Sequence, residues 1–195
     1  MPRPTALGYS THLDAEEGTR SPTSWPGPPP GHPGASHRTT ESEAMKVVDT
    51  LSFLSGKWTL ERFLTDHRSG TEGRFEGNVT IEAAQSSPNA ALSTRARYDE
   101  AGTLRFGMHV GPASRSLDYV RLECGVVMLY FTDGKRFVDL DLRSGTWRST
   151  HPCGEDQHEI FTVVRSPRQV EERWRVRGPT TNFDAVAILR RRGDP

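Results

Sequence analysis

The stretch Arg136-Phe137-Val138-Asp139-Leu140-Asp141-Leu142 is followed, after Arg143, by the turn pair Ser144-Gly145. Apolar and acidic side chains alternate in it without a break from Val138 to Leu142. Successive side chains of an extended chain point to opposite faces, so this alternation predicts a β-strand with one apolar face. The Ser-Gly pair predicts a reverse turn. Residues 136–145 therefore predict a strand and its turn, and the same unit recurs along the chain.

Similar units of roughly 8–12 residues follow one another on both sides of this stretch. Turn sequences such as Arg68-Ser69-Gly70, Glu100-Ala101-Gly102 and Asp133-Gly134 separate them. Before the first unit, apolar residues at helical spacing predict a short helix over residues 47–54, which Gly56 ends. The expected strands cover residues 57–66, 73–83, 92–98, 104–110, 116–123, 126–131, 136–142, 146–149, 159–164, 170–177 and 184–190.

These strands predict an all-β fold. Parallel neighbours need long crossover connections, usually helices, and the sequence offers no such helix between the strands. The sheet is therefore expected to be antiparallel and meandering. Closing so many strands on themselves removes exposed edges. We expect an antiparallel, up-and-down barrel of about ten strands, with a short N-terminal helix.

The first 44 residues differ in composition from the rest of the chain. They hold eight of the 14 prolines and, among Leu, Ile, Val and Phe, only Leu7 and Leu13. So little apolar surface cannot offset the entropy of ordering a backbone. We expect residues 1–44 to be a disordered, proline-rich tail and residues 45–192 to be the barrel domain. The run Pro26-Gly27-Pro28-Pro29-Pro30 leaves open an adaptor that binds a polyproline-reading partner.

Charge and composition argue against several classes of protein. Lys plus Arg number 25 and Asp plus Glu number 25, so a basic footprint for nucleic acid or for an anionic membrane is not expected. The sequence shows neither a membrane-spanning apolar run nor the apolar stretch of a secretory signal. Its two cysteines, Cys124 and Cys153, are expected to be free thiols in a reducing compartment. The expected location is the cytoplasm.

Gly56-Lys57-Trp58 opens the first long strand after the helix, and Arg190-Arg191-Arg192 ends the last strand. This arrangement resembles the lipocalin and wider calycin pattern, in which an Arg of the terminal strand packs over the Trp at the barrel entrance. The resemblance implies that Gly56, Trp58 and Arg190 close the barrel. The rest of the three-stretch signature of secreted lipocalins is missing, which argues against extracellular transport.

Other stretches are similar to a small uncharacterised family of intracellular lipocalin-like domains. They are residues 54–58, 130–139 and 151–156, the last taken together with 174–179. This resemblance covers roughly residues 50–192. It implies a barrel and no established activity, so no catalytic residue is carried over.

Polar and aromatic side chains on otherwise apolar strands are the candidates for a binding site. In a barrel of calycin size the interior is a cavity with apolar walls and a few placed polar groups. The period of two does not say which face is inside, so these side chains either line the cavity or face water. The candidates are Arg97, His109, Tyr119, Arg121, Tyr130, Asp139, Asp141 and Trp174, with Tyr98 as a further wall residue.

Cofactor sites are less well supported. His151, Cys153 and His158 are residue types that ligate zinc, but their spacing matches no standard zinc pattern, and Pro152 and Gly154 indicate an ordinary turn. We therefore expect no metal site there. A heme would need an axial His near an apolar pocket, for which His109 and His158 are the candidates. Nucleophile-elbow and phosphate-binding motifs are absent from the sequence.

The leading hypothesis is a barrel that binds a small, largely apolar ligand. The alternatives are a barrel enzyme of cyclase or isomerase type, which holds a substrate in a reactive conformation in the same cavity, and a heme-binding barrel. The sequence determines neither the identity of the ligand nor the oligomeric state.

Overall fold

The computed structural model describes residues 44–83 and 94–193. The tail predicted at residues 1–44 lies, apart from Ala44, outside these residues, together with its proline-rich run. Helix α1 (Thr50–Leu54) comes first, and ten strands follow it along the chain. They are β1 (Gly56–Asp66), β2 (Thr71–Ala83), β3 (Arg95–Phe106), β4 (His109–Arg121), β5 (Val127–Phe131), β6 (Arg136–Leu140), β7 (Thr146–Cys153), β8 (Asp156–Ser166), β9 (Gln169–Arg177) and β10 (Asn182–Arg191).

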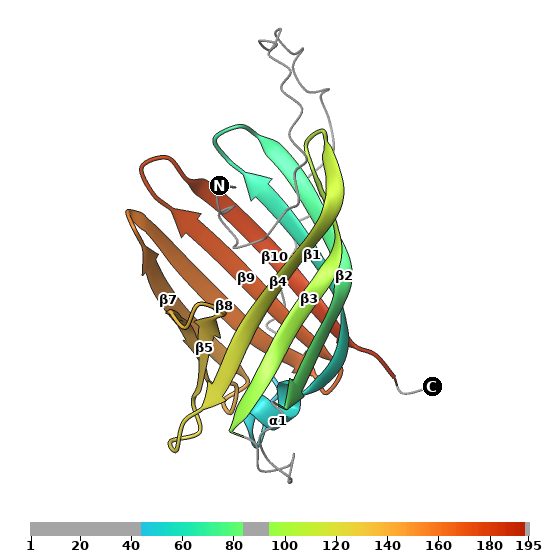
Figure 1. Ribbon diagram of the computed structural model, residues 1–195, viewed down its shortest axis with the longest axis vertical. Coiled ribbons are helices and arrows are strands. Elements are labelled where there is room, and N and C mark those ends of the chain that lie inside the picture. Colours follow the sequence, from blue (N-terminus) through green and yellow to red (C-terminus); the bar gives the residue numbers. More distant parts are fainter. Residues whose placement is uncertain (1–43, 84–93, 194–195) are drawn as a thin grey trace, which may run out of the picture.

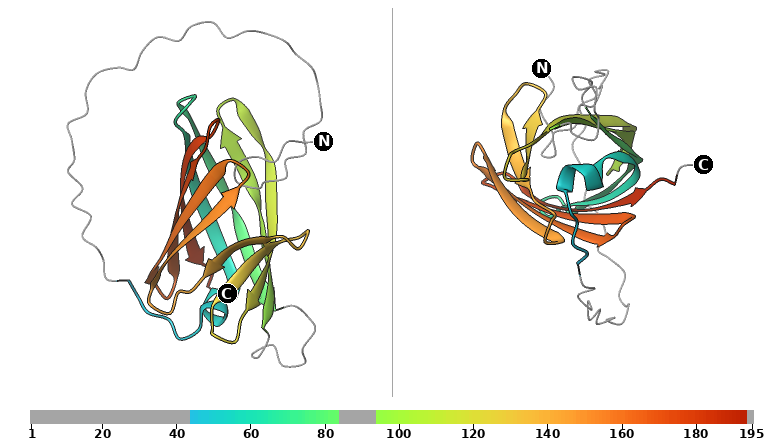
Figure 2. Two further views of the ribbon diagram at one scale, coloured as in Figure 1. Left: turned by 90° about the vertical axis from the view of Figure 1, so that its left-hand side faces the viewer. Right: turned by 90° about the horizontal axis from the view of Figure 1, so that it is seen from below.

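The strands form one antiparallel sheet in the order β6-β5-β4-β3-β2-β1-β10-β9-β8-β7. Every strand pairs with its neighbours in the chain except that β6 and β7, the two ends of the sheet, do not pair with each other, and the β1–β10 pair joins the first strand to the last. The sheet curls into a nearly closed barrel (Figures 1 and 2). The all-β, antiparallel, up-and-down barrel expected from the sequence is confirmed. Among the described residues, no helix is long and apolar enough to cross a membrane.

The two end strands of the sheet, β6 and β7, meet through side chains. Trp147 Nε1 of β7 donates to the carbonyl oxygen of Asp139 in β6 at 3.1 Å, and Ser149 Oγ donates to Asp139 Oδ1 at 2.5 Å. The rings of Phe137 and His151 lie 5.2 Å apart across the same junction. We call this junction the β6–β7 seam.

The turn expected at residues 100–102 and the break expected between the strands 104–110 and 116–123 are both absent, and the chain instead turns at Gly107-Met108, within the expected strand 104–110. β3 continues through the sequence Glu100-Ala101-Gly102, which was expected to turn. Gly102 serves a close approach instead, since a Cβ atom there would lie 2.2 Å from the carbonyl oxygen of Glu76. β4 likewise continues through Pro112. β5 pairs only with residues 117–121 of β4, so one edge of β4 has no partner strand around Pro112. Proline lacks a backbone N–H group, and on this edge no ladder hydrogen bond requires one.

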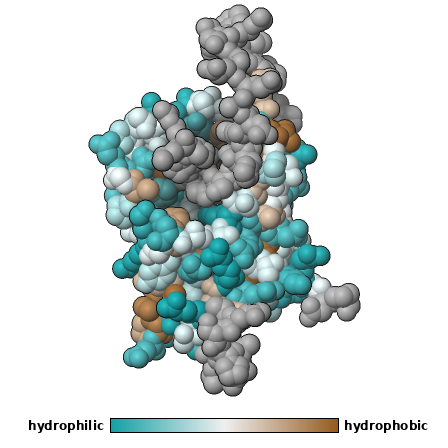
Figure 3. Space-filling model, in the orientation of Figure 1, coloured by the Kyte–Doolittle hydropathy of each residue, from teal (hydrophilic) through white to brown (hydrophobic). Residues whose placement is uncertain are grey.

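Alternation along the strands separates the interior from the surface. In β10, for example, Ala185, Ala187 and Leu189 are buried, while the residues between them are more exposed. The face seen in Figure 3 is mostly hydrophilic, as expected when the outward positions carry charged side chains. The interior is therefore where a binding site built by the fold has to be sought.

Helix α1 lies at one end of the barrel (Figure 2, right). Trp58 Nε1 donates to the carbonyl oxygen of Leu54 at 2.8 Å, which fixes the helix to the first strand. Arg191 is paired with Trp58 in the β1–β10 register, and its guanidinium carbon lies 4.1 Å from the centroid of the indole. Arg191 also donates to the carbonyl oxygens of Ser55, at 2.9 Å, and Phe53.

The predicted closing residue, Arg190, does not occupy this place. Arg190 is one position from Arg191 and so points outward, where it lies 3.6 Å from Glu61. Gly56 begins β1 with a φ of +119°, a conformation that side-chain-bearing residues rarely adopt. A Cβ atom at Gly56 would also lie 3.0 Å from the guanidinium of Arg191. Gly56, Trp58 and Arg191 thus meet at the end of the barrel that α1 occupies.

Candidate functional site

A cavity lies inside the barrel, against the strands on either side of the β6–β7 seam. Its volume is about 20 Å³, which is room for about one water molecule. Its lining comes from strands β3 to β9, so residues far apart in the sequence meet there. They are Tyr98, Arg115, Leu117, Tyr119, Leu129, Phe137, Val138, Asp139, Leu140, Trp147, Ser149, Ile160, Thr162, Glu172 and Trp174.

Aromatic rings form much of the cavity wall. Tyr98 and Tyr119 of neighbouring strands stack with their centroids 5.6 Å apart and their planes 11° from parallel. Phe137 of β6 stacks on Trp174 of β9 at 5.7 Å, so this contact spans the interior near the seam. Such rings present large, flat apolar surfaces that suit the faces of a planar organic molecule.

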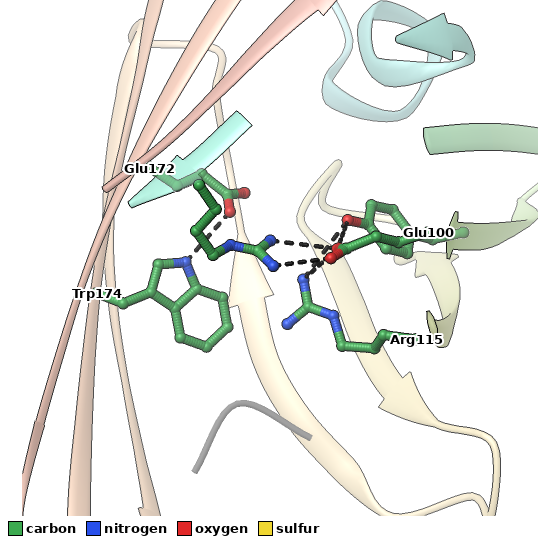
Figure 4. A network of polar contacts seen from close by, with 6 residues as sticks. Glu100, Arg115, Glu172 and Trp174 are labelled. Atoms are coloured by element: carbon green, nitrogen blue, oxygen red, sulfur yellow. Dashed lines mark hydrogen bonds and ion pairs between the residues drawn. The ribbon is translucent and has the colours of Figure 1, made fainter. Parts of the chain in front are cut away.

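A buried ionic cluster adjoins this wall (Figure 4). Arg62 Nη1 and Nη2 donate to the two carboxylate oxygens of Glu100, at 2.8 and 3.2 Å. Arg115 Nη2 donates to Glu100 Oε2 at 3.0 Å, and the Tyr98 hydroxyl donates to the same oxygen at 2.5 Å. Arg62 and Glu100 are each only 1% exposed. Two guanidinium groups and a phenol thus surround one carboxylate in the interior.

The protonation states follow from this geometry. Burial pushes the pKa of Glu100 upward, but the charges of Arg115 and Arg62 and the Tyr98 hydrogen bond outweigh it, so the pKa lies below its ordinary value. Burial lowers the pKa of Arg115, but Glu100 outweighs that effect and the net shift is upward. Burial, followed by the charge of Glu100, raises the pKa of Tyr98. The cluster is therefore ionised, with Tyr98 as a neutral donor.

Two further carboxylates line the cavity. Glu172 Oε2 accepts a hydrogen bond from Trp174 Nε1 at 3.2 Å, and Asp139 Oδ1 accepts one from Ser149. Neither carboxylate forms an ion pair with any residue of the described ranges 44–83 and 94–193. Acidic side chains away from full solvent are usually paired, so these two are unusual.

Two hydroxyl groups on the cavity wall also lack protein partners. Tyr119 is 5% exposed and Thr162 is 2% exposed, and both line the cavity. Within the described part of the chain, neither hydroxyl makes a hydrogen bond. Burial, with a smaller contribution from the charges of Tyr98 and Glu172, raises the pKa of Tyr119, so its phenol stays protonated. Buried polar groups normally find a partner, and a water molecule or ligand in the cavity would supply one.

Three of the residues predicted to bind a ligand meet at this cavity: Tyr119 of β4, Asp139 of β6 and Trp174 of β9. Tyr98, predicted as a wall residue, lies there too. Their role in binding remains a prediction, but the fold brings them together from four separate strands.

The other predicted binding residues lie elsewhere. Arg97 points outward and donates to Asp118 at 2.8 Å, and Arg121 donates to Asp49, the residue that caps α1, at 2.9 Å. Asp141 follows β6 and pairs with Arg143 at 2.6 Å. Tyr130 is half-buried and does not line the cavity. The three charged side chains, Arg97, Arg121 and Asp141, thus have partners outside the cavity.

The histidines are also away from the cavity. His109 begins β4 beside the β3–β4 turn, at the end of the barrel opposite α1. His158 pairs with His151 across β7 and β8, with the two rings 5.9 Å apart. Neither predicted heme ligand lines the cavity. The described residues contain no group of three or more His, Cys, Asp or Glu side chains placed to hold a metal ion.

Sequence reasoning missed several charged residues of the interior: Arg62, Glu100, Arg115 and Glu172. Charged side chains on strands usually face water, so a charge was a reason to place a residue outside. A signal was nevertheless present in the register. Arg115, for instance, falls between Ala113 and Leu117 on the apolar face of its strand. A charged residue at an inward position of a strand whose other inward positions are apolar therefore indicates a buried ionic group.

Comparisons with known proteins agree with this architecture. Residues 54–191 match the family described as "Family of unknown function (DUF6314)", and the chain belongs to this family. The resemblance to an uncharacterised family of barrel domains is thereby confirmed. A search of curated proteins finds no match.

Solved structures show the same fold at low sequence identity. The S-type phycobiliprotein lyase CPES from Guillardia theta superposes with a TM-score of 0.59 and 11% identity, over 79% of this chain and 97% of the lyase chain. A protein of unknown function from the DUF3598 family of Nostoc punctiforme has a TM-score of 0.50 and 10% identity, over 78% of this chain and 51% of its own. At these identities the likeness is one of fold alone.

Proposed function

We propose that this protein binds a small organic molecule in the barrel cavity, with aromatic rings as its walls and a few polar groups as its anchors. The observation that carries the proposal is that two buried residues of the cavity wall, Tyr119 and Thr162, have hydroxyl groups without a hydrogen-bond partner among the described residues. A filled barrel core has no need of such groups, whereas a binding site uses them to orient a ligand.

A ligand larger than a water molecule requires the cavity to widen, and the β6–β7 seam is the place where widening costs least. β1 to β5 and β8 to β10 are joined to both neighbours by backbone ladders, whereas β6 and β7 meet through side chains. Strands held by few hydrogen bonds open more readily than the body of a sheet. Movement of the β5–β6 hairpin away from β7 would expose the aromatic wall to solvent and admit the ligand.

The test is a fluorescence titration of the full chain with N-phenyl-1-naphthylamine, a neutral aromatic probe whose emission rises in apolar surroundings. Ile160 lines the cavity, and its neighbour Phe161 on β8 points outward beneath Arg148. Ile160→Trp fills the cavity and is expected to abolish binding, whereas Phe161→Trp adds the same ring outside and is expected to preserve it.

Folding of both variants is checked by circular dichroism and thermal unfolding. Saturable binding that Ile160→Trp removes and Phe161→Trp retains supports the site. Absence of saturable binding by the wild type, or equal binding by two folded variants, overturns it.

The exposed free thiols of Cys124 and Cys153 fit our expectation of a reducing compartment such as the cytoplasm.

A barrel enzyme is the second candidate. The structure at a TM-score of 0.59 is named as a lyase, and here Asp139, Glu172 and the Tyr119 hydroxyl face one cavity. Carboxylates and a phenol in one confined space are groups that transfer protons in general acid–base catalysis. Turnover of a bound molecule that Asp139→Asn abolishes without loss of binding would establish this alternative.

A further inference from the structure

The charges around the cavity are unequal. Glu172 and Asp139 each present a carboxylate to it, and Arg115 is the one basic side chain among the described residues of its lining. Behind the wall, Arg62 and Glu100 add one charge of each sign. This interior group therefore contains two positive and three negative side chains. The group therefore has one more negative than positive charge, and a cation would offset the cost of holding that charge partly away from water.

Arg115 is already engaged by other groups of the protein. Its Nη2 already donates to Glu100 Oε2, and its guanidinium carbon lies 5.4 Å from the centroid of the Trp174 ring and 5.6 Å from that of Tyr98. The group is thus held between two aromatic rings and against a carboxylate. An anionic ligand would have to compete with Glu100 for Arg115 and would meet Asp139 and Glu172 as well.

The aromatic wall favours the same sign of charge. The face of an aromatic ring carries partial negative charge and attracts ammonium groups, the more strongly where water is excluded. Trp147, Trp174, Phe137 and Tyr119 all line this cavity. Rings combined with carboxylates are a common means of recognising organic ammonium ions. The hydroxyls of Tyr119 and Thr162 can serve the uncharged part of the same molecule.

We propose that the ligand is an organic cation: a compact molecule with a protonated amine or quaternary ammonium group whose charge is neutralised by Asp139 and Glu172 and whose body lies against the aromatic wall. This inference rests on the proposed function and names the chemical class of its ligand.

The experiment compares three probes with one ring system and different charges: 1-naphthylmethylamine, 1-naphthalenemethanol and 1-naphthoate. Their affinities for the full chain are measured by isothermal titration calorimetry at neutral pH. The cation is expected to bind at least about tenfold more tightly than the anion, with the neutral probe between them, since one partly desolvated charge contact is worth about this much.

Two isosteric variants locate the effect. Glu172→Gln and Asp139→Asn remove one charge each while keeping an acceptor for Trp174 and Ser149, and each is expected to weaken the cation about tenfold and the neutral probe little. The matched control is Glu159→Gln, on the outer face of β8 and 3.8 Å from Arg175, which is expected to leave all three affinities unchanged.

The outcomes separate this inference from the proposed function. If 1-naphthoate binds as tightly as the amine, or if both variants keep the ratio of the two affinities, the cavity binds ligands but the cationic class is wrong. If none of the three probes binds and N-phenyl-1-naphthylamine also fails, the proposed function falls and this inference falls with it.

Discussion

Glu100 is the residue on which the interior charges depend. Arg62, Arg115 and Tyr98 all donate to its two oxygens, and the carboxylate is closed to water. A buried ion pair contributes little net stability compared with a well-packed apolar pair, but removal of one partner leaves the other charge buried without compensation. The barrel therefore tolerates Arg62 and Arg115 in its interior because Glu100 is there.

Glu100→Gln is accordingly expected to lower the free energy of unfolding by about 3–5 kcal/mol. The control is Asp99→Asn, one position away on the outer face of β3, where the carboxylate pairs with Arg97 at 3.4 Å in contact with water. That change is expected to cost less than about 1 kcal/mol. Guanidinium-induced unfolding measures both. Equal losses in the two variants would contradict the assignment of Glu100 to the interior.

A second comparison at this scale concerns the two neighbouring arginines at the end of β10. Arg191→Met removes the stacking on Trp58 and the hydrogen bonds to Ser55 and Phe53, and is expected to lower the free energy of unfolding by about 2 kcal/mol. Arg190→Met removes only an exposed contact with Glu61 and is expected to change it by about 0.5 kcal/mol or less. Thermal and urea unfolding measure both variants. A larger loss of unfolding free energy in Arg190→Met than in Arg191→Met would show that Arg190, and not Arg191, closes the barrel.

At the scale of the strands, sequence periodicity was sufficient wherever the outer face was polar and the inner face apolar. β2 and β6 were predicted almost to their ends for this reason. β3 was not, because Glu100-Ala101-Gly102 has the composition of a turn, and only the neighbouring strand explains it. Gly102 is required by the carbonyl of Glu76, and Glu100 by two arginines from β1 and β4. Contacts between distant strands are not encoded in local composition.

The same limit applies to the candidate site. The presence of Tyr119, Asp139 and Trp174 at the cavity could be proposed, since each is an aromatic or acidic residue on a clear strand. Its second carboxylate, Glu172, was missed because it lies within the consecutive charged residues Glu171-Glu172-Arg173, although its register places it between Val170 and Trp174 on the apolar face of β9. Which face is inside depends on the direction in which the sheet curls, and a period of two is identical for both directions.

The β6–β7 seam contains an element that responds to pH. His151 of β7 contacts Phe137 of β6 and faces His158 of β8. Burial and the neighbouring charge of His151 lower the pKa of His158, with Asp156 acting in the opposite sense. Burial and Arg136 lower the pKa of His151, against a hydrogen bond with the backbone of Phe137. The folded seam thus favours both imidazoles in the neutral form.

The sign of the pH dependence follows. Because the pKa values are lower in the folded state, the unfolded chain binds more protons, and the free energy of unfolding falls as the pH drops through about 6.5. Paired carboxylates lose their contribution only at lower pH, below about 4.5. Urea unfolding between about pH 5 and 7.5 is expected to show this slope in the wild type. The variant His151→Phe/His158→Leu should be flat over that range; an unchanged slope would place the titrating groups elsewhere.

For the molecule as a whole, backbone pairing is continuous in one part of the barrel and is interrupted at the β6–β7 seam in the other. β1, β2, β3 and β10 form the long, continuously paired part of the sheet, next to the end where α1, Trp58 and Arg191 meet. The seam lies on the opposite side, and the cavity beside it is lined by residues of β3 to β9. Binding sites commonly occupy such less stable regions, because admission of a ligand requires local movement on a rigid scaffold.

This division predicts that substitutions at the cavity which stabilise the fold weaken ligand binding. Thr162 is almost fully buried, and its hydroxyl has no described protein partner. Thr162→Val keeps the shape of the side chain and removes a hydroxyl that has no described partner on a buried residue, so the free energy of unfolding is expected to rise by up to about 1 kcal/mol. Tyr119→Phe is expected to act in the same direction.

Binding should change in the opposite sense, because a ligand that satisfies these hydroxyls loses a hydrogen bond in each variant, which corresponds to a severalfold weaker affinity. Thr150→Val, the same substitution at an exposed position of β7, is the control and should change neither quantity appreciably. Chemical unfolding and calorimetry with 1-naphthylmethylamine are performed on the same samples. A Thr162→Val protein that is less stable and binds equally well would show that the hydroxyl is part of the packed core. The hydroxyl would then not support the assignment of the cavity as a binding site.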